Sequence, residues 1–394
     1  MINTKKERCL KEVEDILSLA KLSKDDIKPL SQAIYFTEQN LYNHNFRLLQ
    51  LEPHLLKEIT EGSELCFKGE KDEELVICSE TQTFQVVEAE TSNSLLLVNN
   101  MKFTKDIDDS LSSAVHGVAV KGIFYEYLES SLGKPHLKKL DDLLKTFPYK
   151  GPEHEFEVNK ENLYSFEELC DKIQASKSEL REALSMMTIV EINGKIRTLD
   201  IEYHFRILSY MLKLLEENSW ETDEVDFKET VDSLKELAPK EVVSHLFDKY
   251  TEESKEIDGI ALYKYKEDEV CKFFAKVLLH ETGKFNLNEF LQAWRDSVPE
   301  GMVPYEEMLY GIAIIDRKSN PNFIWSFEES NLPENINERF KILFAAKEKW
   351  SVPEISPYIK RLATDKIDVN ALLAKHARAS KINGIKYYSS KHGK

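Results

Sequence analysis

The side chains best suited to bind a ligand are basic and lie near the C-terminal end of the chain. Residues 335–394 contain 13 Lys and Arg against 5 Asp and Glu, a net charge of +8, while the whole chain has a net charge of −17. Lysine and arginine bind phosphate oxygens, and a tyrosine ring stacks on an unpaired base. The residues predicted to bind DNA are Lys360, Arg361, Lys375, Arg378, Lys381, Lys386 and Tyr387.

A second interpretation of this basic segment stays open. Six basic residues and no acidic residue lie between Val369 and Lys394, and such a segment is also typical of a solvated tail that aids solubility or nuclear import. The negative net charge of the whole chain argues against a protein that coats nucleic acid by charge alone. Any DNA contact is therefore expected to be local.

The sequence contains no pattern typical of a catalytic or metal site. The four Gly-Lys pairs, at 133, 194, 283 and 393, lack the other residues of a nucleotide-phosphate loop. A G-x-S-x-G elbow and an H-E-x-x-H helix are missing as well. Five scattered cysteines without C-x-x-C spacing indicate reduced thiols of a cytosolic or nuclear protein. We therefore predict a non-enzyme with no catalytic residues, no metal and no cofactor.

A repeated turn organises the second half of the chain. Ile-Asn-Gly or Ile-Asp-Gly occurs at 192–194, 257–259 and 382–384, between short β-prone runs, which predicts three hairpins. A fourth hairpin is expected around Ser319–Asn322. The four turns then recur with a period of roughly 63 residues, which indicates an internal repeat.

A residue pattern typical of helix starts recurs at a similar distance before each of these turns. About 30 residues before each turn, a side chain able to cap a helix is followed three residues later by glutamate. The four pairs are Ser165/Glu168, Asp226/Glu229, Asn286/Glu289 and Ser351/Glu354. Two helices followed by a hairpin is the order of a helix-turn-helix with a wing, so we predict a tandem array of winged-helix domains.

The charge of the predicted second helices differs between the units. In a helix-turn-helix the second helix enters the major groove, where acidic residues oppose phosphate. The second helices of the first three units are neutral or acidic, at 176–187, 239–252 and 304–310. The last unit is the one expected to contact DNA, and the others are expected to scaffold or bind protein.

The N-terminal part has a different pattern, with short apolar runs separated by polar turns. The runs lie at 46–49, 65–67, 75–78, 84–87, 95–98 and 115–127, with one helix at Pro53–Thr60, and they predict an antiparallel, barrel-like sheet. Leu95–Val98 and Val118–Tyr127 do not alternate with polar residues, which indicates burial on both faces. Either the N-terminal helical segments or a partner chain covers them. The residues predicted to contact a partner are Leu95, Leu97, Ile123 and Tyr125.

The predicted organisation is α+β with four parts. Residues 1–155 form the β-rich partner-binding domain, and residues 156–220 and 221–284 form winged helices 1 and 2. Residues 285–394 form winged helix 3 together with a terminal basic helix-turn-helix and wing unit.

Several stretches resemble a known family in combination. They lie at Gly69–Ser79, Glu90–Asn93, Leu140–Pro152, Ser297–Val303, Pro333–Asn335, Glu338–Phe340 and Glu348–Trp350. The chain resembles the Defective in sister chromatid cohesion subunit of the alternative, cohesion-type replication factor C clamp loader, over nearly its whole length. None of these stretches is a catalytic motif.

The resemblance implies a nuclear, non-catalytic accessory subunit that helps load or unload the sliding clamp at replication forks and supports sister chromatid cohesion. It implies that the N-terminal domain shares a barrel with a small companion subunit and the C-terminal tail of the large ATPase subunit. It also implies that the winged helices bind DNA, single- or double-stranded and independently of sequence, and that the module docks on the catalytic region of DNA polymerase epsilon and acts indirectly on the sliding clamp. The family is described with three winged helices, whereas the repeat gives four units.

Two other classes of protein fit the same residues. One is a winged-helix transcription regulator that acts alone, which would need a strongly basic recognition helix. The other is a winged-helix scaffold that binds only protein. Sequence-independent DNA binding would argue against the regulator, and an absence of DNA binding would favour the scaffold.

Overall fold

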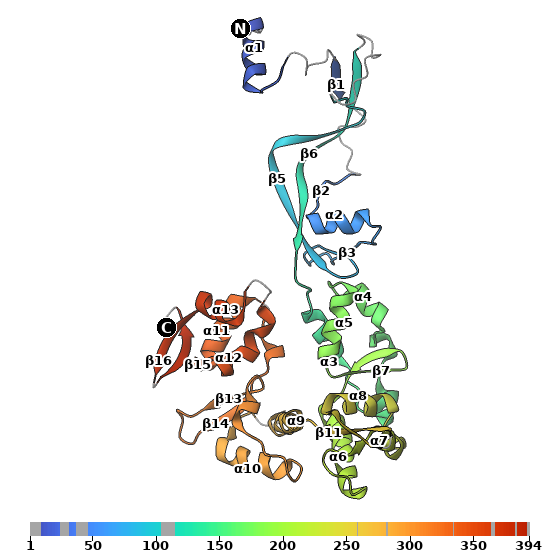
Figure 1. Cartoon of the computed structure of the whole chain (residues 1–394), viewed down its shortest axis with the longest axis vertical. Helices are drawn as coiled ribbons and strands as arrows, with labels where there is room; N and C mark the ends of the chain where they lie inside the picture. The colour runs from blue at the N-terminus through green and yellow to red at the C-terminus, as the bar shows by residue number, and fades with distance from the viewer. Residues whose placement is uncertain are drawn as a thin grey trace. The chain divides into compact units, whose positions relative to one another are not determined.

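The protein is described by a computed structural model that covers residues 9–23, 31–36, 46–103, 115–257, 259–280, 283–333, 335–363, 367–382 and 384–391. The chain divides into two compact units (Figure 1). Unit 1 comprises Met1–Pro135 with Gln174–Glu179, and unit 2 comprises His136–Ile173 with Leu180–Lys394. Within the described ranges, no helix is long and apolar enough to span a membrane.

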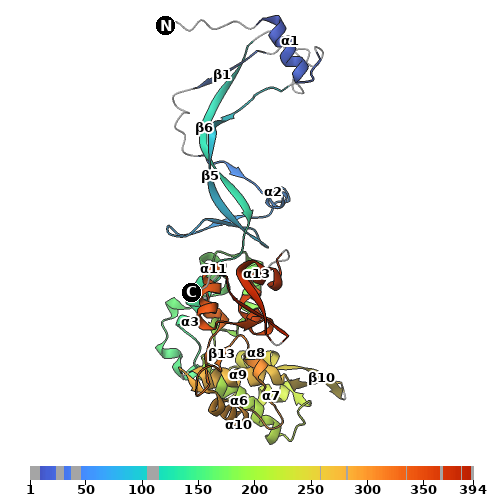
Figure 2. The ribbon, with the colours of Figure 1, turned by 90° about the vertical axis from the view of Figure 1, so that its left-hand side faces the viewer.

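Unit 1 is built on one six-stranded sheet with the order β1-β6-β5-β4-β3, in which β2 also pairs with β6. Its elements are α1 (Leu10–Leu19), β1 (Gln32–Phe36), β2 (Leu49–Gln50), α2 (Pro53–Thr60), β3 (Cys66–Lys68), β4 (Val76–Cys78), β5 (Thr83–Val98) and β6 (His116–Leu132). The two long strands β5 and β6 run together as its spine (Figure 2).

The sheet of unit 1 is mixed, which corrects the expectation of a purely antiparallel one. Strands β3 to β6 pair antiparallel as expected. Strands β1 and β2 instead pair with β6 in parallel. Neither strand is connected to β6 by a hairpin, so the chain connection does not require an antiparallel pair. Closure of this sheet into a barrel stays a prediction.

Strand β5 is continuous where a turn was expected between residues 87 and 95. The polar residues Thr91–Asn93 lie inside the strand, and the register with β6 shifts between Glu90 and Leu95. A bulge of this kind absorbs extra residues without ending a strand. Polarity alone predicted a turn here because these residues face water rather than a core.

Unit 2 contains four repeats of a similar order of elements: a helix, a short strand or bridge, two or three further helical segments and a hairpin. Repeat 1 contains α3 (Lys138–Thr146), α4 (Phe166–Lys172), α5 (Lys177–Met186), β7 (Ile189–Ile192) and β8 (Lys195–Thr198), with a single bridge between Tyr164 and Ile196 in place of the short strand. Repeat 2 contains α6 (Ile201–Glu217), β9 (Val225–Asp226), α7 (Phe227–Leu234), α8 (Lys240–Tyr250), β10 (Thr251–Ile257) and β11 (Ile260–Tyr265).

The third repeat follows the order of the second, and the fourth has three helical segments before its hairpin. Repeat 3 contains α9 (Glu267–His280), β12 (Phe285–Asn286), α10 (Leu287–Ser297), η5 (Glu306–Leu309), β13 (Ala313–Asp316) and β14 (Phe323–Ser326). Repeat 4 contains α11 (Ile336–Ala346), β15 (Trp350–Ser351), α12 (Val352–Ile359), η7 (Lys360–Leu362), α13 (Val369–His376), β16 (Ala377–Ile382) and β17 (Ile385–Ser390). In repeats 2 to 4 the last hairpin strand lies in the middle of a three-stranded sheet.

The four predicted hairpins are confirmed, and their turns explain the repeated glycine. Asn193 and Gly194 both have positive φ, 52° and 74°, and Gly259 and Gly384 have φ of 80° and 84°. A two-residue hairpin turn needs this left-handed backbone, which glycine adopts without strain. Asp258 and Asn383, the first residues of two of these turns, lie outside the described residues.

The four predicted helix starts are confirmed as well. Ser165 and Ser351 form reciprocal capping boxes with Glu168 and Glu354. The side chains of Asp226 and Asn286 accept hydrogen bonds from the backbone N–H groups three residues on. One element differs from expectation, since the second helix of repeat 3 is only the 3-10 turn η5. The segment is followed by Gly311, whose φ is 90°.

Two large apolar cores lie in unit 2. The larger core runs from Tyr149 to Ile324 through repeats 1 to 3, and the smaller core consists mainly of repeat 4 together with Ile314 of repeat 3. Tyr358 of repeat 4 donates its hydroxyl hydrogen bond to the carbonyl of Ala313 in repeat 3, 3.2 Å away. The core of repeat 4 thus differs from the larger core and includes a buried side chain of repeat 3.

A buried imidazole lies in the larger core. The Nε2 atom of His204 on α6 lies 3.0 Å from the hydroxyl of Tyr250 on α8, and its ring stacks on Phe273 of α9 with 3.9 Å between ring centroids. Burial, together with the nearby cations Lys249 and Lys276, holds the pKa of His204 well below its ordinary value. Burial and Lys249 also lower the pKa of His245 on α8, although Asp248 opposes this.

These histidines predict that unit 2 loses stability in mild acid. Because their pKa values are lowered in the fold, the folded chain binds these protons at lower pH than the unfolded chain does, so this contribution to stability is complete above the ordinary pKa of 6.5 and falls as the pH drops below it. The free energy of unfolding, measured between pH 8 and pH 5 by denaturant titration, should fall below about pH 6.5. His204→Gln should reduce this slope. A flat profile between pH 7 and pH 5 in the unchanged chain would contradict the prediction.

Candidate functional site

The hairpin of β16 and β17 has two chemically different faces. Residues directly opposite across an antiparallel pair share a face, and successive residues alternate between faces. Lys381 is paired with Lys386, on the face that carries the buried Tyr388 further along the strand. Arg378 and Tyr387 lie on the opposite face. The predicted DNA-binding residues of the hairpin are therefore split between its two faces.

The two lysines of this hairpin have no acidic partner among the residues that the structure describes. Within the described part of the chain, Lys381 and Lys386 make no ion pair, and the Nζ atom of Lys386 lies 5.0 Å from the centroid of the Tyr388 ring. The hairpin of repeat 2 differs, because Lys255 pairs with Asp223 and Glu224 at 3.2 Å and 2.7 Å. Its Lys264 pairs with Glu252 at 3.0 Å. Among the described residues, the lysine charge of the fourth hairpin is not neutralised by an acid, and that of the second is.

The three remaining predicted DNA-binding residues lie on helical segments of repeat 4. Lys375 is exposed in the last turn of α13, and its carbonyl accepts a hydrogen bond from Nζ of Lys391. Lys360 is exposed on η7. Its neighbour Arg361 pairs with Glu329 at 3.2 Å, so this guanidinium is already partly engaged. Lys394 lies outside the described residues.

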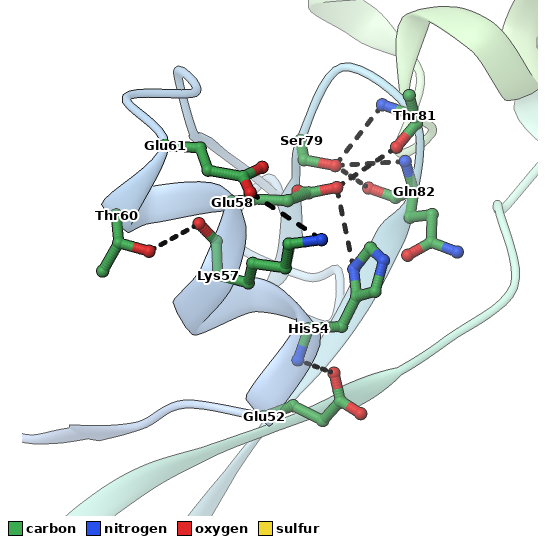
Figure 3. A network of polar contacts seen from close by, with 9 residues as sticks. All are labelled: Glu52, His54, Lys57, Glu58, Thr60, Glu61, Ser79, Thr81 and Gln82. Carbon is green, nitrogen blue, oxygen red and sulfur yellow. Dashed lines mark hydrogen bonds and ion pairs between the residues drawn. The ribbon is translucent and has the colours of Figure 1, made fainter.

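In unit 1, one end of the sheet is covered by the helix α2 of the same unit. Leu55 of α2 packs with Ile77 and Phe84 in a small core, and all three are fully buried. A side-chain hydrogen bond joins α2 to the turn between β4 and β5 (Figure 3). Glu58 accepts a hydrogen bond from the Thr81 hydroxyl at 3.3 Å.

The same turn is fixed internally. Ser79 Oγ accepts hydrogen bonds from the backbone N–H groups of Thr81 and Gln82, at 3.3 Å and 3.2 Å. His54 on α2 places its Nδ1 atom 3.7 Å from Glu58 (Figure 3). We assign this network a structural role, which is to make one end of the sheet a rigid base.

The other end of the sheet exposes apolar side chains on both faces. Leu95 and Leu97 lie on the face of β6 that carries Phe124, and they are 40% and 37% exposed. Leu96 and Ile123 are paired on the opposite face, which Tyr125 shares at 65% exposed. The predicted partner-contacting residues therefore cluster at one end of the sheet but are divided between its faces.

Strand β5 also has an open edge at this end. Strand β4 pairs with β5 only at Thr83–Gln85, and the Val86 N–H donates to the Leu75 carbonyl. From Val87 to Val98, no strand among the described residues pairs with this side of β5. The N-terminal helix α1 has no buried residue. Unpaired N–H and C=O groups along an apolar strand are what a strand of another chain needs for pairing.

The comparison with known proteins decides the family. The sequence model of the family described as Sister chromatid cohesion protein Dcc1 matches residues 46–359. The chain belongs to this family. Among its similar proteins are those named Sister chromatid cohesion protein DCC1 from Danio rerio, 37% identical over 386 residues, Xenopus tropicalis, 35% over 386, and Homo sapiens, 34% over 390. Each alignment covers 98% of this chain and 98% or 99% of the relative.

The residues matched by the Dcc1 family model include one of the two candidate interfaces and not the other. The match includes the four predicted partner-contacting residues and ends at residue 359, before all seven predicted DNA-binding residues. One part of the exposed sheet was missed by sequence reasoning, namely β1, whose Ile34, Tyr35 and Phe36 are each about half exposed. Its five residues, Gln-Ala-Ile-Tyr-Phe, carry a β-prone signal, but the strand is short and polar sequence surrounds it.

Proposed function

We propose that this Dcc1-family chain is a non-catalytic accessory subunit of an alternative clamp loader, which helps load or unload the sliding clamp at replication forks in the nucleus and supports sister chromatid cohesion. The observation that carries the proposal is the end of the β5–β6 sheet, which is apolar on both faces and open at the β5 edge. A surface of this kind is typical of a protein that is completed by its partners. The names of its relatives support the link to cohesion.

The partners proposed for unit 1 are the C-terminal tail of the large ATPase subunit and its small companion subunit. Their strands would pair with the β5 edge and cover Leu95, Leu97, Ile123 and Tyr125, closing a shared barrel. The ATP chemistry would then belong to the partner, in line with the missing phosphate loop. The catalytic region of DNA polymerase epsilon is proposed as a further partner of the module.

Unit 2 is proposed to be an array of winged helices. The support is the recurring order of helix, short strand or bridge, two or three helical segments and hairpin, with the last strand central in three of the sheets. Repeat 4 is proposed to bind DNA through phosphates and without sequence preference, because its hairpin alone combines lysines with no acidic partner in the described structure. The same role for Lys360, Arg361, Lys375, Arg378 and Tyr387 stays part of the proposal.

Co-purification of the proposed partner subunits tests whether the exposed end of the β5–β6 sheet is the interface. In cells that co-express the full-length chain with the two proposed partner subunits, Leu97→Asp with Tyr125→Asp should abolish co-purification, because a carboxylate on each face would be buried without a counter-charge. The matched control is Leu132→Asp, at an exposed position on the other end of β6, which should leave co-purification unchanged. Equal recovery of partners by the double variant would exclude these faces as the interface.

Two rival functions make different predictions. A stand-alone transcription regulator would discriminate strongly between DNA sequences, and a protein-only scaffold would bind no DNA. A shift assay on the full-length chain with two unrelated duplexes at two salt concentrations separates them, since the proposal expects equal, salt-sensitive binding to both.

A further inference from the structure

The turn of the fourth hairpin carries a pair of exposed isoleucines. Ile382 and Ile385 are directly opposite each other across the turn, and they are 38% and 53% exposed. They lie on the face of the hairpin that also carries Tyr387, while Lys381 and Lys386 lie on the reverse face. The tip is thus apolar on one side and basic on the other.

The second hairpin has the same apolar tip in opposite electrostatic surroundings. Ile257 and Ile260 are paired across its turn with similar exposure, 45% and 51%. The next pair behind them is Glu256 and Ala261, in the position where the fourth hairpin has two lysines. An isoleucine pair is therefore common to two repeats, but only in repeat 4 is it combined with cations suited to phosphate.

This combination distinguishes between forms of DNA. The lysines bind phosphates of any DNA, but isoleucine cannot satisfy the hydrogen-bonding edges of bases in an intact groove. An apolar side chain gains by contact with a base face, which in continuous duplex first requires opening of a stacked step. Where stacking is already interrupted, a base face is exposed without that cost, and a nearby aromatic ring adds to the contact.

We propose that the apolar tip formed by Ile382, Ile385 and Tyr387 packs against unstacked bases, so that repeat 4 prefers a junction between duplex and single-stranded DNA over continuous duplex. This inference rests on the proposed DNA binding of repeat 4. Lys381 and Lys386 hold the neighbouring phosphates from the reverse face of the hairpin. The preference comes from the isoleucines and the salt dependence from the lysines.

The test measures binding of the full-length chain to three labelled DNAs of equal length by fluorescence anisotropy: continuous duplex, duplex with a single-stranded overhang, and single strand. The unchanged chain should bind the overhang DNA about tenfold more tightly than continuous duplex. Ile382→Thr with Ile385→Thr retains β-branching and should remove this preference, while leaving duplex affinity within about twofold. Ile257→Thr with Ile260→Thr is the matched control and should retain the preference.

Different failures have different meanings. If the chain binds DNA but does not prefer the overhang, or if the Ile382/Ile385 variant retains the preference, the proposed tip contact is wrong and DNA binding stands. If the control variant loses the preference equally, the effect does not belong to repeat 4 and the proposal is also wrong. If the chain binds none of the three DNAs, the proposed function fails as well. Thermal unfolding of each variant confirms folding, and Ile385→Thr alone, with half of the change, replaces the double variant if that one unfolds.

Discussion

Reversing four charges in repeat 4, with Lys375→Glu, Arg378→Glu, Lys381→Glu and Lys386→Glu, is expected to weaken DNA binding by about 100-fold or more at low salt. Each lost phosphate contact also removes counter-ion release, so the slope of log affinity against log salt should become shallower by about 3 to 4. All four side chains are exposed, so the substitutions should leave the core of repeat 4 intact. Affinities at several salt concentrations provide both quantities.

The matched control changes the net charge by the same amount elsewhere in unit 2. Lys213→Glu, Lys228→Glu, Lys235→Glu and Lys240→Glu alter four exposed lysines of repeat 2. If binding depends on the local site, this variant should keep most of its affinity and its salt slope. If both variants lose affinity equally, the effect is that of overall charge and repeat 4 is not the DNA site.

Replacing the buried Arg339 with methionine is expected to cost about 3–5 kcal/mol of folding free energy. Arg339 on α11 is 3% exposed, and its Nε donates to the Pro333 carbonyl at 2.7 Å. Its Nη atoms donate to the carbonyls of Tyr358 and Leu332, at 2.8 Å and 3.1 Å, and to the carboxylate of Glu329. The substitution would leave several hydrogen-bond acceptors without their donor. In denaturant unfolding, repeat 4 should therefore unfold before the rest of unit 2.

The neighbouring Arg361 supplies a control for this prediction, because it pairs with the same carboxylate of Glu329 from an exposed position. Exposed ion pairs contribute about 0–1 kcal/mol, so Arg361→Met should barely change stability. A loss of less than about 1 kcal/mol for Arg339→Met would show that the buried network is not what holds α11.

The local signals of unit 2 were strong enough to predict its repeats from sequence. Helix caps such as Ser165 with Glu168, and turns such as Asn193-Gly194, depend on neighbours within a few residues, and the structure contains them as expected. The 3-10 turn η5 departs from the pattern because it is too short for periodicity to distinguish from a helix. Arg339 was also missed as a structural centre, since its partners include the backbone of Tyr358, distant in sequence.

Unit 1 was harder to predict because its contacts join distant segments. The parallel pairing of β1 with β6 joins residues 32–36 to residues 116–120, and no local turn pattern in the sequence predicts it. For the candidate DNA site, composition located the basic residues but could not tell which share a face. Only the register of β16 and β17 places Tyr387 with the isoleucines and away from Lys381. The ion pair that engages Arg361 likewise depends on the fold.

Hydrogen–deuterium exchange along β5 tests the proposed adaptor role most directly. The full-length chain is compared alone and in complex with the two proposed clamp-loader subunits, and the backbone amides of Glu88–Val98 that point away from β6 are followed, since alternate amides of β5 already bond to β6. Because this edge has no strand partner within the described residues, exchange should be fast in the chain alone and at least about tenfold slower in the complex. Equal exchange in both states would contradict the account, since the open edge of β5 would then not be where the partner strands pair.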